Sequence, residues 1–431
     1  MSRTPILAVM LLSLAASCSK DAPKLPGGSN RSAAEVPGAE KQAESAAKLP
    51  SKDNPPPKLL SRGQIEAGWI SLFDGQTLFG WQANSDLNWS VKDGVLGADE
   101  KGSPGLLLTT FELADYELHC EFRLEKGGNS GIFLRTVPKP NDPANDCYEL
   151  NICDKHPQGF TTGSLVKRKK TAKAFVGEGE WKAFDVRVEG NRIEAKLGGE
   201  TVIELDDDSK GLQKTGHIGL QMNGGKIEFR NVRLRPLGTR PIFDGTSLDG
   251  WRVVAGSKSE FAADDDGIHV SNGPGFLETE NTWADFALQA DARTNGKHLN
   301  SGIFFRALPG TAEAPSNGYE LQIHHTFAGG DRTQPNDYGT GFGTGAVFRR
   351  TKVRWVNADD NEWCTLTLIA NGPHFSTWVN GYQVIDWTDE RETDETPRKG
   401  LRTQAGHLSL QGHDATTDLH FKNLRIADLP K

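Results

Sequence analysis

Two glutamates stand at the same position of a short motif that occurs twice in this chain. Glu149 belongs to the segment Tyr-Glu-Leu-Asn-Ile, and Glu320 belongs to Tyr-Glu-Leu-Gln-Ile. Nearby, the segment Asn-Ser-Gly-Ile-Phe leads to Arg135 in one place and to Arg306 in the other. A carboxylate can take up a proton, and a guanidinium can stabilise the negative charge left behind. These residue types could therefore do proton-transfer chemistry twice.

Whether the arginine and the glutamate of each copy can meet depends on the strands that carry them. Residues 131–135 carry large apolar groups on both faces, which predicts a central strand, and in residues 148–153 Leu150 and Ile152 are expected to face the core with Glu149 and Asn151 on the other side. If the two strands are neighbours, an arginine and a carboxylate with an amide beside it share the concave face of one sheet. The alternative is an ordinary Arg–Glu pair on a solvent-exposed face, since such pairs are common and contribute little.

The motifs belong to a duplicated domain. Residues 73–81 (Phe-Asp-Gly-Gln-Thr-Leu-Phe-Gly-Trp) return as residues 243–251 (Phe-Asp-Gly-Thr-Ser-Leu-Asp-Gly-Trp), and the later motifs follow in the same order. Each copy is too long to be a solenoid unit that needs its neighbours to bury a core. Any function assigned to one copy must therefore be tested in both.

Alternation of apolar and polar residues runs through both copies, for example over residues 116–124 and 286–293. Turn dipeptides such as Gly190-Asn191 and Asn380-Gly381 separate the segments. The closing segments change phase at Asn231 and Asn423, which predicts a β-bulge in each. The sequence thus predicts an all-β protein made of two tandem antiparallel β-sandwiches.

Composition limits the kinds of partner. The net charge of −8 and a pI near 5.8 argue against nucleic acid and against an anionic membrane surface. The basic run at residues 167–170 is best interpreted as a solvated loop. Four cysteines follow Cys18, and their positions predict no disulfide framework: Cys120, Cys147, Cys153 and Cys364.

The first residues have the pattern of an export signal. Arg3 precedes an apolar stretch that is far shorter than a membrane-spanning helix, and small residues lead to Cys18. Residues 1–18 are therefore expected to be a lipoprotein-type signal with Cys18 as the lipidation site. The protein is expected to be exported to a bacterial cell envelope, as a periplasmic or outer-membrane lipoprotein. An ordinary secretory signal with a stray cysteine is the alternative.

Residues 19–64 are rich in Lys, Glu, Ala, Ser and Pro and are expected to form a disordered tether. The two domains are expected at residues 65–237 and 238–431, and no later segment is apolar enough to cross a membrane.

Together these motifs resemble the 3-keto-disaccharide hydrolase domain family, over about residues 68–237 and again over 240–429. The resemblance rests on residues 68–75 with Gly80-Trp81, the Asn-Ser-Gly-Ile-Phe and Tyr-Glu-Leu segments, Thr162-Gly163-Ser164 or Thr344-Gly345-Ala346, and residues 216–221 with 229–234. It implies a concanavalin A-like, jelly-roll type sandwich in each copy. It also implies action on glycosides whose sugar C3 hydroxyl has been oxidised to a ketone, by lyase, hydratase or net hydrolase chemistry.

The resemblance suggests roles for the motif residues. Glu149 and Glu320 would be bases or metal ligands, and Arg135 and Arg306 would stabilise the oxyanion. The candidate substrate-binding residues are Asn129, Asn151, Gln221, Asn300, Gln322, Gln411 and His324. A divalent metal ion is expected by analogy only, and its ligands cannot be read from the sequence. On one extended strand Glu320 and His324 would lie about 13 Å apart, too far to share an ion without a bend.

Three readings of the function remain open at this point. The first is an enzyme that cleaves 3-keto-glycosides by removing the C2 proton, followed by β-elimination and hydration. The second is a carbohydrate-binding, lectin-like lipoprotein on the same fold, because a fold does not determine a function. The third divides the chain into one catalytic copy and one that only binds or supports.

Overall fold

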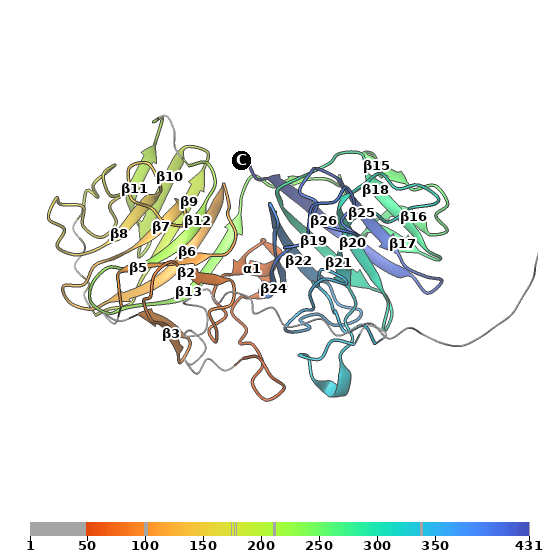
Figure 1. The fold of residues 1–431 in the computed structure, drawn as a ribbon, viewed down its shortest axis with the longest axis horizontal. Helices are drawn as coiled ribbons and strands as arrows, with labels where there is room; N and C mark the ends of the chain where they lie inside the picture. Colours follow the sequence, from red (N-terminus) through yellow and green to blue (C-terminus); the bar gives the residue numbers. More distant parts are fainter. Residues whose placement is uncertain are drawn as a thin grey trace, which may run out of the picture. The chain divides into compact units, whose positions relative to one another are not determined.

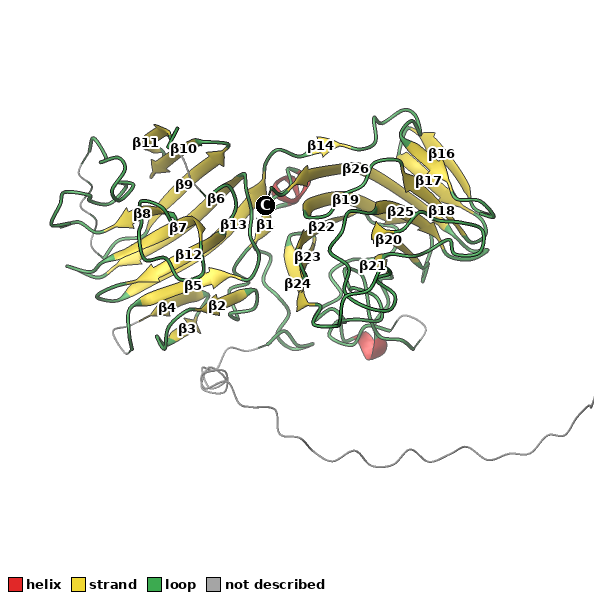
Figure 2. Ribbon diagram, turned by 45° about the horizontal axis from the view of Figure 1, so that its top comes forward, coloured by secondary structure: helices red, strands yellow, loops and turns green. Residues whose placement is uncertain are grey.

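The computed structural model describes residues 49–98, 102–173, 175, 177, 179–209, 213–336 and 339–430 (Figure 1). These residues form two antiparallel β-sandwiches, one for each copy of the repeat, as Figure 2 shows in yellow. The predicted all-β sandwich fold is confirmed. The signal sequence and Cys18 lie outside the described residues.

The first sandwich pairs a large sheet with a smaller one. The large sheet runs β11 (Glu200–Asp206), β10 (Arg192–Leu197), β9 (Lys182–Glu189), β6 (Tyr116–Leu124), β13 (Ile227–Pro236), β4 (Val95–Ala98) and β3 (Trp89–Lys92), and β1 (Ile70–Ser71) pairs with β13. The five-stranded sheet runs β2 (Trp81–Ala83), β5 (Gly105–Thr109), β12 (His217–Met222), β7 (Ser130–Thr136) and β8 (Tyr148–Ile152).

The second sandwich repeats this strand order. Its large sheet runs β16 (Glu260–Asp264), β17 (Gly267–Ser271), β26 (Asp418–Asp428), β19 (Phe286–Thr294), β22 (Cys364–Asn371), β23 (His374–Val379) and β24 (Tyr382–Thr388), and β14 (Arg240–Pro241) pairs with β26. Its five-stranded sheet runs β15 (Trp251–Val253), β18 (Gly275–Thr279), β25 (His407–Gly412), β20 (Ser301–Ala307) and β21 (Tyr319–Ile323). A short 3₁₀ helix, η2 (Ala328–Gly330), follows β21.

The alternation seen in the sequence becomes the burial pattern of the strands. Strand β6 buries every second residue, beginning with Tyr116, and these side chains fill the first core. The bulges expected at Asn231 and Asn423 are confirmed. Both asparagines have φ near +50°, and the pairing register shifts beside each of them. The four cysteines that follow Cys18 are buried and free, in agreement with the sequence prediction.

Of the expected tether, residues 19–48 lie outside the described residues and residues 49–64 are described. Helix α1 (Arg62–Glu66) begins inside the range expected to be disordered. A capping box between Ser61 and Gln64 starts this helix. The Arg62 guanidinium then donates to the main-chain carbonyl of Trp363, 3.0 Å away in the second sandwich. Specific contacts thus order residues whose composition alone suggested disorder. None of the described helices has the length and apolar character needed to span a bilayer.

Candidate active site

Glu149 lies on the face of the five-stranded sheet that points away from the first core. Its neighbour across the β7–β8 pair is Phe133, and Gln221 of β12 lies on the same face. The adjacent residues Ile132 and Leu150 point to the opposite side, into the core. The two-residue period of the strands is therefore what gathers these three side chains on one surface.

Gly131 provides the space that the carboxyl group occupies. A Cβ atom at this position would lie 3.3 Å from Glu149 Cγ and 3.4 Å from Gln221 Oε1, closer than most such contacts. The second copy has Gly302 here, whose added Cβ would lie 3.0 Å from Glu320 Cγ. The glycine of the repeated Asn-Ser-Gly motif is thus explained by close approach of a side chain.

A cavity of about 340 Å³ lies over this face of the first sandwich. Its residues include the carboxyl and amide groups of Glu149 and Gln221, the apolar side chains of Leu106 and Phe133, and Lys139 at the rim. Leu106 and Phe133 belong to a small apolar cluster that is separate from the main core. A cavity with an apolar wall and a few convergent polar groups is the usual form of a small-molecule site.

The environment of Glu149 changes its acidity. Burial raises the pKa of this carboxyl group to about 7, because the ionised form loses its hydration. A hydrogen bond from Gln221 and the charge of Lys167 oppose the rise in pKa. A carboxyl group with a pKa near neutrality can both take up and return a proton at physiological pH.

The amide of Gln221 has unused capacity for hydrogen bonding. Its Oε1 atom is buried and accepts no hydrogen bond from a described residue, and the same is true of Gln411 Oε1 in the second copy. A buried acceptor without a donor is costly, so a ligand hydroxyl group would stabilise it. Both glutamines thus retain the binding role expected from the sequence as a prediction.

The expected meeting of Arg135 with Glu149 is wrong. Arg135 lies in a bulge of β7 with φ of +48°, where the register of the β7–β12 pair shifts. Its guanidinium donates to the carbonyls of Ala114 and Gly190 and pairs with Asp115 at 2.7 Å. The side chain lines a different cavity, of about 780 Å³. A regular strand would have aimed Arg135 at Glu149, whereas the bulge redirects it.

Arg306 repeats this arrangement and is corrected in the same way. It also has φ of +48°, donates to the carbonyls of Ala284 and Gly372, and pairs with Asp285 at 2.9 Å. Its side chain is fully buried. The repeated arginine therefore ties strands to loops in both sandwiches, and the oxyanion role expected for it has no geometric support.

Another arginine lies beside Glu320. Arg398 comes from the loop at residues 389–406, and one of its guanidinium nitrogens is 3.8 Å from the Glu320 carboxylate. The guanidinium also lies 5.2 Å from the ring centre of Phe304, the residue opposite Glu320 on β20. Sequence analysis missed Arg398 because it lies in an irregular loop that has no periodic pattern. The corresponding loop of the first copy, residues 207–216, is shorter.

The remaining predicted binding residues differ in whether their side chains lie near one another. The Asn151 amide donates to the carbonyl of Phe160, which commits it to holding a loop. The Gln322 amide donates to Asn300 Oδ1 at 3.3 Å, so these two predicted binding residues do lie together. His324 is buried and contacts the Thr326 hydroxyl at 2.8 Å.

The geometry does not test the substrate-binding roles predicted for Asn129 and His324. The hydrogen bonds described for Asn129 are those of its main chain, with Asn223 and Gly224. The pKa of His325, next to His324, is lowered to about 4 by burial. Substrate binding by Asn129 and His324 stays a prediction.

In the part of the chain that the structure describes, neither glutamate belongs to a group of three clustered metal-ligand side chains. Among the described residues, the one group of three ligating side chains within 4.8 Å is Asp264, His269 and His420, on the large sheet of the second sandwich. There His420 Nε2 already lies 3.0 Å from Asp264, and His269 Nε2 lies 2.8 Å from Asp418. Among the described residues, Glu149 and Glu320 are thus not part of a group of three ligating side chains, the divalent metal stays a prediction, and no step below depends on it.

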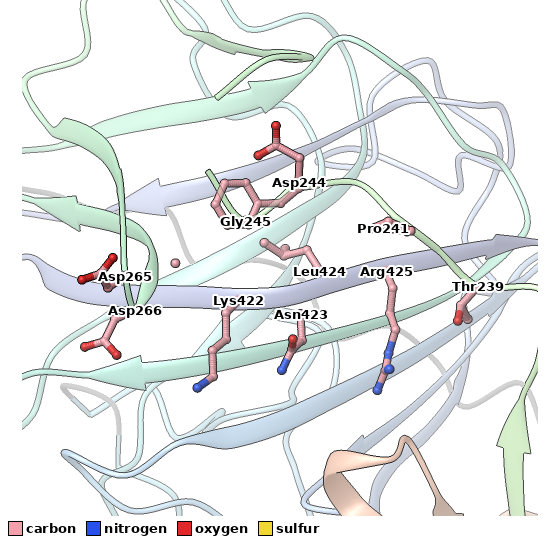
Figure 3. A pocket seen from close by; sticks show the side chains of 12 residues that line it. Thr239, Pro241, Asp244, Gly245, Asp265, Asp266, Lys422, Asn423, Leu424 and Arg425 are labelled. Atoms are coloured by element: carbon pink, nitrogen blue, oxygen red, sulfur yellow. The ribbon is translucent and has the colours of Figure 1, made fainter. Parts of the chain in front are cut away.

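A further cavity lies away from both glutamates. Figure 3 shows this space of about 480 Å³, with Asp265 and Asp266 at one end and Lys422 extending from β26. It contains neither Glu320 nor any of the predicted amides. The cavity over Glu149 is therefore the one that combines a perturbed carboxyl group with the repeated motif.

Comparison with known proteins agrees with the motifs. A family model described as a 3-keto-alpha-glucoside-1,2-lyase-like domain matches residues 68–235 and 238–427. A Bacteroides thetaiotaomicron protein named 3-keto-disaccharide hydrolase is 24% identical over 231 residues, covering 39% of this chain and 79% of that protein.

Solved structures give weaker matches. A candidate glycosyl hydrolase from Parabacteroides distasonis matches 41% of this chain and 98% of its own, with 21% identity and a TM-score of 0.38. A carbohydrate-binding module from Bacillus subtilis matches 42% of this chain and 95% of its own, with 18% identity and a TM-score of 0.28.

Proposed function

This chain belongs to the 3-keto-alpha-glucoside-1,2-lyase-like domain family, and from that membership we propose that its first sandwich cleaves 3-keto-glycosides with Glu149 as the base. The observation that carries the proposal is the Glu149 carboxyl group in its cavity, with a pKa of about 7. The name of the Bacteroides thetaiotaomicron relative supports hydrolysis of a 3-keto-disaccharide as the overall reaction.

The chemistry follows from the position of the ketone. A carbonyl at C3 acidifies the C2 proton, which the Glu149 carboxylate takes, and the C2–H electrons form an enediolate with its charge on the C3 oxygen. When that enediolate collapses, the C1–oxygen bond breaks, and the departing oxygen receives a proton from the now protonated Glu149 or from water. Addition of water across the resulting double bond gives net hydrolysis. This route needs one carboxyl group with a pKa near neutrality, not the two carboxylates of most glycosidases.

The other groups of the cavity suit supporting tasks. Lys139 lies at the rim, where an ammonium group could stabilise the enediolate oxygen. Gln221 donates to Glu149 and keeps its own Oε1 for a sugar hydroxyl. Leu106 and Phe133 provide an apolar wall that lowers the local dielectric and strengthens these interactions.

Exchange of the C2 proton tests this function directly. The full chain is incubated with a 3-keto-glucoside in deuterated water, and deuterium at C2 and release of the aglycone are followed together by NMR. Exchange and release by the parent chain, both lost in Glu149→Gln with folding intact by circular dichroism, are expected. A parent chain that binds the sugar but neither exchanges nor cleaves it would favour the lectin-like alternative. A parallel incubation with a chelator tests the metal ion expected by family analogy.

We also propose that the protein is exported and anchored by lipid at Cys18, on the strength of the sequence pattern alone. Labelling of cells with an alkyne-tagged fatty acid should mark the parent chain and leave Cys18→Ser unlabelled. Equal labelling of both chains would contradict the anchor.

A further inference from the structure

The two sandwiches carry the same basic dipeptide in the same turn but balance its charge differently. Lys167-Arg168 in the first copy corresponds to Arg349-Arg350 in the second. Lys167 and Arg349 have φ of +61° and +60°, and in each turn the next residue donates its main-chain N–H to the carbonyl three residues earlier. The backbone positions therefore match, and differences in side-chain pairing come from the surrounding residues.

In the first copy both charges are neutralised. Lys167 pairs with Asp142 at 2.8 Å, and Arg168 pairs with Asp207 at 2.5 Å. The Arg168–Asp207 pair is largely buried, and the Arg168 guanidinium lies 4.1 Å from the ring centre of Tyr148. Lys167 and Arg168 of the first sandwich thus each have a carboxylate partner.

In the second copy the matching acid is used elsewhere. Asp389 directly follows the edge strand β24 of the large sheet, as Asp207 directly follows the edge strand β11 in the first copy. It binds Arg391 at 2.7 Å and accepts a hydrogen bond from the Tyr319 hydroxyl at 2.7 Å. Arg350 donates instead to the main-chain carbonyls of Pro397 and Arg398. Within the described part of the chain, neither Arg349 nor Arg350 forms an ion pair.

A third guanidinium adds to this excess. Arg398 is about one-third exposed and lies 3.8 Å from Glu320, while its other hydrogen bonds go to Ser316. The pKa of Arg350 is lowered by burial and then by the neighbouring charges of Arg391 and Arg398. The pKa of Arg398 is lowered by burial and by Arg349, and the single charge of Glu320 opposes this. Among the described residues, Arg398 is thus the one of these three guanidinium groups that forms an ion pair with a carboxylate, while the charge of Asp389 acts on Arg350 without forming an ion pair with it.

We propose that Arg349, Arg350 and Arg398 form a binding site for an anionic saccharide on the second sandwich. Guanidinium groups bind carboxylate and sulfate groups through paired, charge-assisted hydrogen bonds. The adjacent Gln322–Asn300 amide pair, on the strands that carry Glu320 and Phe304, suits the hydroxyl groups of the same sugar. The site takes a sugar that bears a carboxylate or a sulfate group.

Calorimetric titration of the full chain tests this site without relying on turnover, so a failure here is distinct from a failure of the proposed catalysis. The probes are digalacturonate, a sulfated disaccharide, neutral cellobiose and inorganic sulfate, each at low and high ionic strength. Binding of at least one anionic sugar, weakened by salt and absent for cellobiose, is expected. Which of the two anionic sugars binds identifies the charged group. Binding of inorganic sulfate alone would indicate an adventitious ion only and overturn the proposal, as would equal binding of cellobiose.

Matched variants assign the binding to these residues. Arg349→Ala, at an exposed position, should weaken binding of the anionic sugar about 10-fold, and Arg398→Gln should weaken it further. The control is Lys167→Ala, the same position in the first copy, which should leave affinity unchanged. Melting temperatures within the range of the parent chain show that the variants are folded. Unchanged affinity in both arginine variants, or an equal loss in Lys167→Ala, would overturn the assignment.

Discussion

The two sandwiches agree in the residues that hold the fold together and differ in the surroundings of the glutamate on the outer face of the five-stranded sheet. Arg135 and Arg306 occupy the same bulge, bind equivalent carbonyls and pair with equivalent aspartates. By contrast, Glu149 lies in an open cavity with Gln221, whereas Glu320 lies beside Arg398 from a longer loop. Duplication thus preserved the structural network, while the loops gave each carboxylate its own electrostatic environment.

The largest difference between the copies should be catalytic. Glu149→Gln should lower the rate of C2 exchange by about 10²–10⁴-fold, because the base is removed with little change in volume. Glu320→Gln should keep most of the activity, since Arg398 already engages that carboxylate. Initial rates measured on both variants decide this comparison. If Glu320→Gln is the inactive variant, the assignment of the two copies is reversed.

The structural arginines should affect stability strongly in both copies. Arg306→Met should lower the free energy of unfolding by about 3–5 kcal/mol, because it leaves the charge of Asp285 buried and unpaired. Arg135→Met should cost less, since its partner Asp115 is 29% exposed, compared with 8% for Asp285. Urea denaturation measures both values. A variant that keeps its stability but loses turnover would restore the catalytic role for the arginine.

The pH dependence of turnover should depend on the first copy alone. As the base, Glu149 must be ionised, so the rate should rise with pH and level off above about 7. Gln221→Met removes a hydrogen bond that lowers the pKa of Glu149 and should move the profile to higher pH. Gln411→Met, the matching change in the second copy, should leave the profile unchanged. If the two variants have pH profiles with the same midpoint, Gln221 does not affect the pKa of Glu149.

The raised pKa of Glu149 also makes the stability of the folded protein depend on pH. Because the pKa of Glu149 in the folded protein lies above its ordinary value of 4.5, the folded state holds this proton more tightly than the unfolded chain does. The resulting stabilisation is fully present below pH 4.5 and is lost as the pH rises through about 7. Denaturation of Glu149→Gln should show a smaller loss of stability over this range than the parent chain.

The smallest effects should come from the glycines under the two carboxylates. Gly302→Ala should be the more damaging to stability, by about 1–3 kcal/mol, because its Cβ would lie 3.0 Å from Glu320 Cγ. At Gly131 the equivalent distance to Glu149 is 3.3 Å, so Gly131→Ala should reduce turnover more than stability. Melting temperatures and exchange rates of the two variants give the comparison. Equal behaviour would show that the difference between 3.0 and 3.3 Å has no effect.

Several features were predictable because they depend on neighbours in the chain. The two-residue period identified the strands, and the change of phase at Asn231 and Asn423 identified their bulges. The repeated motifs also identified the family and named Glu149 and Gln221 as candidates, and the structure then showed that they share one face. Arg135 was misplaced because its bulge leaves no change of phase in the apolar pattern, so the strand looked regular until its end.

The sequence by itself thus determined the duplication, the order of the chemistry-bearing motifs along the chain and the family, because each depends on local pattern or repeated motifs. Only the tertiary structure decided which charges meet. Glu320 meets Arg398, Asp389 turns to Arg391, and burial brings the pKa of Glu149 to about 7. These outcomes depend on how loops distant in sequence pack over the sheet, since Coulomb energies and desolvation depend on distances in space.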